Sequence, residues 1–339
     1  MDALSEPAIQ RRLALTLIGF GALAAAACLF APLVGSTSIN LSNVFDRSTP
    51  FADNVDAQIF FVARLPRVLA AALVGGGLAA AGVVFQALLR NPLASPDTLG
   101  VSAGAALGAT LAIAFRADFT VLSISAVPLA SFAGSLGALA IVFGLSSARR
   151  RGASTMILLL AGVTLTTLLS AIVAFVQYLA DVTQTFQTVR WMMGSLDVAG
   201  YAPIAIALAP LAIAGAGFAT LPRILDLMSL GADQAATRGV DTVRAERVAL
   251  VSASLSTGAA VSLGGPVPFV GIIVPHLVRL IVGADHRLVL PAAVLFGAAF
   301  LIACDLVART ALAPVELPVG IITAVIGGPV FLWLLFRRA

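Results

Sequence analysis

The sequence predicts an all-α polytopic membrane protein with about ten transmembrane helices. Of the 339 residues, 60% are hydrophobic and 11% are charged, whereas a soluble domain averages about 25% charged residues. The mean hydropathy of +1.05 lies far outside the soluble class. A helix needs roughly 20 apolar residues to span a bilayer. Several long runs without Asp, Glu, Lys or Arg satisfy this need: 13–45, 119–148, 152–180, 198–222, 248–278 and 317–336.

Charges, prolines and turn residues divide the chain into ten predicted helices. The first could instead belong to a cleaved signal peptide, because Arg11 and Arg12 precede an apolar run. That run is longer than a typical signal sequence and many more follow, so we interpret it as an uncleaved first span. We expect a single transmembrane domain, 1–339. Its predicted spans are 12–33, 62–88, 97–115, 120–146, 153–178, 195–220, 243–263, 270–282, 288–308 and 316–337.

The arginines predict the orientation of these spans. All twenty basic residues are arginine, and many lie in short clusters beside apolar runs, where they would orient helices rather than bind nucleic acid. With ten spans both termini share a side. That side would hold fourteen arginines and the other side only six, namely Arg47, Arg64, Arg67, Arg116, Arg190 and Arg309. The bias predicts that both termini are cytoplasmic.

Few ionisable residues fall at the centres of the predicted spans. Ion-coupled secondary transporters commonly use buried Asp, Glu or His relays, so this scarcity counts against that class. The exception, near one end of its span, is Asp305 with Arg309, which lie at i, i+4 on one helix face and can pair. Cys28 and Cys304 fall inside apolar runs without a partner at metal or disulfide spacing, so we expect core residues and no metal site.

The absence of lysine bears on the energy source. The phosphate loop of many ATPases, GxxxxGK[ST], requires a lysine, and this chain has none. If ATP drives the protein, the ATPase is therefore another polypeptide.

The long hydrophilic stretch 222–247, PRILDLMSLGADQAATRGVDTVRAER, would lie on the cytoplasmic side. It predicts a short helix, a turn at Gly231, and a second short helix that stops at Gly239. Two interpretations stay open, an amphipathic helix at the membrane surface and a docking platform for a soluble partner. The mixed charges of Asp226, Asp233 and Arg238 favour the platform, because a lipid-binding face would be purely basic.

A second polar interruption, RNPLASPDTLGVSA at 90–103, separates the second and third spans. Asn-Pro and Ser-Pro end helices and favour turns. Taken alone, it predicts a tight turn between two helices.

Several long blocks occur in a definite order along the chain: ARLPRVLAAALVGGGLAAAGVVFQALLRNPLASPDTLGVSAGA, STMILLLAGV, WMMGSL, LGGPVPFVGIIVPHLVRLIVGADHR and ELPVGIITAVIGGPVFLWLL. In their content and order these blocks resemble the permease subunits of bacterial ABC importers for iron chelates, haem and vitamin B12. The resemblance covers nearly the whole chain. It implies a type II ABC importer permease fold with ten transmembrane helices, a homodimer with the path on its two-fold axis, two separate ATPase subunits and one periplasmic substrate-binding protein.

The resemblance also implies roles for particular residues. Asn91 and Leu93, with Ser154 and Thr155 at the start of the fifth helix, match cytoplasmic gates of the path. Arginines on the outer face would receive glutamates from the binding protein: Arg64, Arg67 and Arg309. Interface anchoring by snorkelling remains an alternative for them, and Arg309 could serve Asp305. The 223–240 segment matches the coupling helices that fit into the ATPase, with contacts from Leu230, Gly231, Ala232, Asp233, Ala236, Arg238 and Gly239.

The expected function is the permease subunit of an importer in the bacterial inner membrane, with no bond made or broken in the cargo. No cofactor is expected on this chain, and ATP and Mg²⁺ would bind the partner ATPase. A ferric siderophore is the preferred cargo, followed by haem and then cobalamin. SPD at 95–97 favours the siderophore class. The alternatives are an ATP-independent secondary transporter or channel, and a membrane assembly subunit without a transport role.

Overall fold

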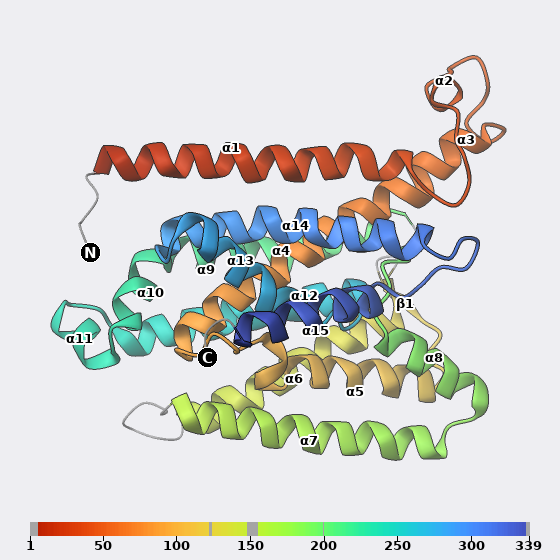
Figure 1. Ribbon diagram of the computed structural model, residues 1–339. Coiled ribbons are helices and arrows are strands. Elements are labelled where there is room, and N and C mark those ends of the chain that lie inside the picture. Colours follow the sequence, from red (N-terminus) through yellow and green to blue (C-terminus); the bar gives the residue numbers. More distant parts are fainter. Residues whose placement is uncertain (1–5, 122–123, 148–154, 199, 337–339) are drawn as a thin grey trace.

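The computed structural model describes residues 6–121, 124–147, 155–198 and 200–336. Its long helices run side by side in a bundle, which confirms the all-α prediction (Figure 1). Among the described residues, seven helical segments are long and apolar enough to cross a membrane, and three further apolar helices are shorter. These helices correspond to the ten predicted spans: α1 (Glu6–Phe30), α4 (Leu65–Leu88), α5 (Val101–Ala114), α6 (Ala126–Ser147), α7 (Thr155–Leu179), α9 (Ala202–Thr220), α12 (Thr242–Gly264), α13 (Val270–Val282), α14 (His286–Thr310) and α15 (Val319–Phe336).

Short elements gather at the two ends of the bundle. One end, called the α8 end here, carries α2 (Leu41–Val44), α3 (Val55–Gln58), the hairpin β1 (Thr120–Val121) and β2 (Ile124–Ser125), and α8 (Val182–Met192). The opposite end, the α10 end, carries α10 (Pro222–Ser229) and α11 (Ala232–Thr237). Figure 1 shows the start of α1 and the end of α15 toward the α10 end, as an even number of spans requires. The remaining elements are η1 (Ala31–Leu33), the π-helical η2 (Ile59–Arg64) and η3 (Pro96–Leu99).

The centre of the bundle is α4, which packs against α12, α13 and α14. Most of its side chains are buried, and small residues allow this close packing. A Cβ on Gly75 would overlap the carbonyl of Gly297 in α14, so only glycine permits the observed approach of these two helices. By contrast, α1 and α7 leave many apolar side chains exposed, including Ile18, Leu29, Leu160 and Phe175. In a membrane protein such surfaces face lipid or another subunit.

The structure corrects two predicted boundaries at the α8 end and adds one helix there. The span predicted over 120–146 begins as a hairpin, and helix α6 starts only at Ala126. The span predicted over 195–220 starts at Ala202, because Gly194 and Gly200 adopt positive φ values of 73° and 74° and interrupt the helix. Helix α8 was not predicted, although Asp181 and Gln184 form a capping box at its start. It is amphipathic and polar enough to escape a search based on hydropathy.

Candidate functional site

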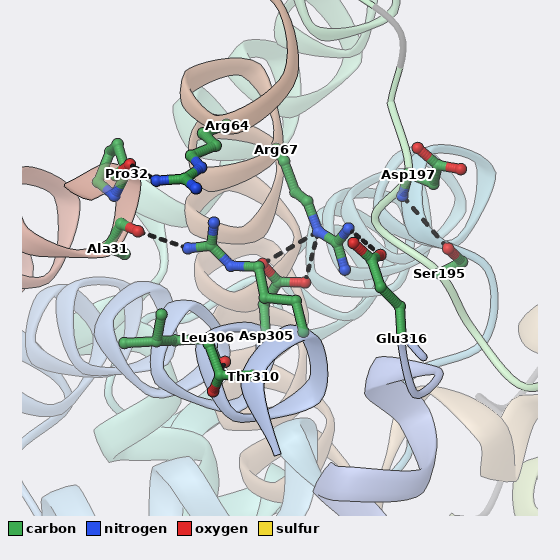
Figure 2. Close-up of polar contacts among 11 residues, drawn as sticks. Ala31, Pro32, Arg64, Arg67, Ser195, Asp197, Asp305, Leu306, Thr310 and Glu316 are labelled. Atoms are coloured by element: carbon green, nitrogen blue, oxygen red, sulfur yellow. Dashed lines mark hydrogen bonds and ion pairs between the residues drawn. The ribbon is translucent and has the colours of Figure 1, made fainter. Parts of the chain in front are cut away.

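The structure brings the three predicted outer arginines together at the α8 end, around Asp305 of α14 (Figure 2). The Nε of Arg67 donates to Asp305 Oδ1 at 2.9 Å and to Oδ2 at 3.2 Å. Its Nη1 donates to Glu316 Oε2 at 2.6 Å. Arg67 therefore bridges a buried carboxylate and a half-exposed one.

Arg64 and Arg309 point into the protein rather than outward. Arg309 is 4% exposed, donates from Nη2 to Ala31 O at 2.6 Å, and places Nε 3.5 Å from Asp305 Oδ2. Arg64 is 6% exposed, and its guanidinium donates to the carbonyl oxygens of Pro32, Leu33 and Thr37. Arg64 thus holds the segment after α1 against η2, and Arg309 holds it against α14 (Figure 2).

The outer cluster, defined as Arg64, Arg67, Asp305, Arg309 and Glu316, has three guanidinium groups for two carboxylates. Buried charges are tolerated when they are paired and hydrogen-bonded, and Asp305, at 1% exposed, has an arginine on each side. The pairing of Arg309 with Asp305 that the sequence allowed is therefore present. Of the three arginines, Arg67 keeps the most direct access to the surface, beside Glu316.

A cavity of about 910 Å³ opens next to Arg67 and Glu316 at the α8 end. Its wall includes Arg190 and Asp197, together with apolar side chains such as Phe186 and Pro318. The cavity therefore offers charged groups of both signs on an apolar background. Such a surface suits transient contact with a large amphiphilic molecule better than tight binding of a small ion.

The polar stretch after α4 forms a tight turn, as predicted. Arg90 adopts a left-handed conformation with φ of 45°. The amides of Arg90 and Asn91 donate to the carbonyls of Ala87 and Gln86, which is the Schellman arrangement at a helix C-terminus. Asn91 Oδ1 accepts the amide of Leu93 at 2.9 Å, and the Leu93 side chain is 43% exposed. Leu93 is therefore free to contact another surface.

The second predicted gate is only partly described. Thr155 is the first residue of α7, whereas Ser154 lies outside the described residues.

The 223–240 segment has the predicted helix, glycine turn and helix. Gly231 lies between α10 and α11 with φ of 125°, and Gly239 ends α11 with φ of 83°, both values that favour glycine. Along this stretch Leu230, Asp233, Ala236 and Arg238 are exposed at the α10 end, and Ala232 is the first residue of α11. The geometry is that of a protruding platform.

A contact that the sequence did not reveal anchors this platform to the bundle. Asp226 Oδ1 of α10 lies 2.6 Å from His286 Nδ1 and accepts the backbone amide of His286 at 3.1 Å. Asp285, beside His286, caps α14 and pairs with Arg287, which holds the pKa of the Asp285 carboxyl below its ordinary value. No local pattern links residues 60 positions apart, so only the folded chain shows this contact.

Comparisons with known proteins identify the family of this chain. The chain matches the FecCD transport family over residues 23–337. It is 39% identical over 310 residues to the hemin transport system permease protein HmuU of Yersinia pestis, covering 90% of each chain. It is 36% identical over 307 residues to the ferric enterobactin transport system permease protein FepD of Escherichia coli, again covering 90% of each. It is also 43% identical over 279 residues to the cobalamin import system permease protein BtuC of Halobacterium salinarum, covering 81% of this chain and 72% of that one.

A solved structure shares the whole fold. It is described as an inward-facing conformation of a metal-chelate type ABC transporter and superimposes with a TM-score of 0.82 at 34% sequence identity. The match covers 95% of this chain and 98% of that chain.

Proposed function

The chain belongs to the FecCD transport family of ABC importer permeases, and from this premise we propose that it moves a ferric chelate, most readily a ferric siderophore, from periplasm to cytoplasm. The observation that carries the proposal is the similarity over nearly the whole chain to permeases whose cargo is hemin or ferric enterobactin. Haem is the second cargo on this basis. Cobalamin is the third, supported by the similarity to a cobalamin permease.

We propose that the energy for transport comes from a separate ATPase that binds the α10 end. This chain has no lysine and hence no phosphate loop of its own. The α10–α11 platform protrudes at that end and is tied through Asp226 to the first turn of α14. ATP and Mg²⁺ would bind the ATPase, and closure of its two copies would push on the platform of each permease in a homodimer.

The α8 end would receive the periplasmic substrate-binding protein. Arg67 is the best placed docking residue, because Arg64 and Arg309 are turned toward the carbonyls of the segment after α1. An acidic side chain of the binding protein would compete with Glu316 for Arg67. The two other arginines would keep the outer cluster positively charged. Asn91 and Leu93 would then gate the opposite end of the path, together with Ser154 and Thr155.

Reconstitution tests this proposal directly. The permease and its cognate ATPase are placed in liposomes with the binding protein outside and ATP inside. Uptake of a ferric siderophore, haem and cobalamin is measured in parallel. We expect ATP-dependent accumulation of one iron chelate and no accumulation when the ATPase is omitted. Accumulation by the permease alone would favour a secondary transporter, and uptake of cobalamin alone would reject the iron-chelate assignment.

A further inference from the structure

Gln86 occupies a buried position in the last turn of α4 and reaches across to α13. Its Nε2 lies 3.2 Å from Gly271 O and 3.3 Å from Ile272 O, and its Oε1 accepts a hydrogen bond from Arg279 Nη1 at 2.5 Å. The side chain is 4% exposed, so both ends of this amide are satisfied inside the protein, as burial requires.

The partner carbonyl on α13 needs an outside donor for a definite reason. Pro275 lies inside α13. A proline has no backbone N–H, so the carbonyl four residues earlier, that of Gly271, loses its intrahelical donor. The amide of Gln86 replaces that donor, while its oxygen binds Arg279 one turn beyond the proline. Gln86 thus contacts α13 on both sides of the proline.

Gln86 and Gly271 also lie at the two ends of the turn that follows α4. The backbone carbonyl of Gln86 accepts the amide of Asn91 at 3.1 Å, which closes the helix end. Pro96, at the far end of the turn, packs beside Gly271, where an added Cβ would come within 2.9 Å of its Cδ. The 90–96 turn is therefore held at one end by Gln86 and at the other by the glycine whose carbonyl Gln86 binds.

We propose that Gln86 is a positioning residue for the 90–96 turn, acting by supplying the donor that Pro275 withdraws from Gly271. Loss of this donor leaves a buried carbonyl unpaired, which α13 relieves by shifting away from α4 and from Pro96. The turn then opens more often. The importance of the turn as a gate rests on the proposed function, whereas its placement by Gln86 does not.

The test measures opening of the turn without any transport. Ala94 is fully buried, so an Ala94→Cys variant, in a chain also carrying Cys28→Ala and Cys304→Ala, reacts with a maleimide only when the turn opens. We expect Gln86→Leu to raise the labelling rate of the full-length permease–ATPase complex in nanodiscs about fivefold, since RT ln 5 is about 1 kcal/mol, the net value of one hydrogen bond. The matched control is Thr110→Val, which removes a buried hydroxyl that has no hydrogen-bond partner among the described residues. We expect this control to leave the rate unchanged.

A second substitution separates positioning from general loosening. Pro275→Ala restores an N–H to α13, so Gly271 no longer depends on Gln86. In that background we expect Gln86→Leu to change the labelling rate little. If Gln86→Leu does not fold, Gln86→Glu serves instead, because its carboxylate still accepts from Arg279, which balances the added charge, but cannot donate to Gly271. An equal rate in Gln86→Leu and Thr110→Val, or an undiminished effect with Pro275→Ala, would overturn the inference even if ATP-dependent uptake is observed.

Discussion

At the residue scale, Asp305 determines how the outer cluster is held together. It is buried and lies between Arg67 and Arg309, which come from different helices. Removal of one partner from a buried ion pair leaves an uncompensated charge. Such an uncompensated buried charge lowers the free energy of unfolding far more than the loss of an exposed ion pair does.

We therefore expect Asp305→Ala to destabilise the protein by about 3–5 kcal/mol, seen as a lower midpoint of thermal denaturation in detergent. Glu316→Ala is the matched control, because it removes the other carboxylate bound to Arg67 but from a half-exposed site. Its effect should stay within about 1 kcal/mol. Similar losses for both variants would show that Asp305 is not the centre of the cluster.

Arg67 gives a separate prediction about the binding protein. Arg67→Ala should weaken association of the cognate binding protein about tenfold, or about 1.4 kcal/mol, and reduce its salt dependence. Glu316→Gln should strengthen association, because it removes the carboxylate that competes for Arg67. The control is Arg116→Ala, at an exposed arginine of the same end. Surface plasmon resonance on nanodiscs measures all three, and equal effects at Arg67 and Arg116 would contradict specific docking.

At the scale of single elements, α8 shows how a short helix outside the spans is stabilised. Asp181 Oδ1 accepts the amide of Gln184 at 2.8 Å, and Oδ2 accepts Arg116 Nη2 at 2.6 Å. The hydrogen bond from Gln184 is the main cause that lowers the pKa of the Asp181 carboxyl, followed by the contact with Arg116. A carboxyl with a lowered pKa in the folded state stabilises that state when ionised, and this contribution is lost on protonation.

The first turn of α8 should consequently become less protected as the pH falls below the ordinary aspartate value of about 3.9. At higher pH the stabilisation is fully present, so no change is expected between pH 5 and pH 8. Hydrogen exchange of the 182–192 segment, corrected for intrinsic rates, measures this loss. Asp181→Asn keeps a residue that caps well but cannot ionise, so its protection should not change as the pH falls below about 3.9. A wild-type protein without that dependence would contradict the assignment.

The elements that the sequence located well are those with strong local signals. Helix α13 spans 270–282, as predicted, because Gly265 and Gly283 flank a mostly apolar run. The glycine turn in the 223–240 segment was likewise visible from Gly231 and Gly239. Hydropathy does not reveal helix α8, because its composition is polar and only the capping box of Asp181 and Gln184 marks its start. The turn after α4 differs from these. Its left-handed residue is Arg90, whereas glycine is the usual residue at that position of a helix end.

At the scale of the whole molecule, the two ends of the bundle are chemically different. The α8 end carries the outer cluster and the cavity beside it, whereas the α10 end carries the platform and the turn with Leu93. An importer needs this polarity, because its cargo donor and its energy source lie on opposite sides of the membrane.

The arginine bias predicts which end faces the cytoplasm, and side-specific labelling checks it. In a chain with Cys28→Ala and Cys304→Ala, Asp53→Cys at the α8 end should react with an impermeant maleimide in intact spheroplasts. Thr237→Cys in α11 should react only after the membrane is permeabilised, since α11 would lie in the cytoplasm. Both positions are exposed, so access to the reagent is the only difference. Labelling in the reverse order would mean that the bundle is inserted the other way.

The sequence by itself determined the fold class, the ten apolar helices, the glycine turn and the family, because hydropathy, turn residues and motif order are properties of neighbouring residues. Only the tertiary structure decided which polar groups meet. Arg67 and Asp305 are 238 positions apart, and Gln86 and Gly271 are 185 apart. Their pairing follows from which helices pack together. A buried charge or an unpaired carbonyl requires a partner, but the local sequence cannot tell from which helix that partner comes.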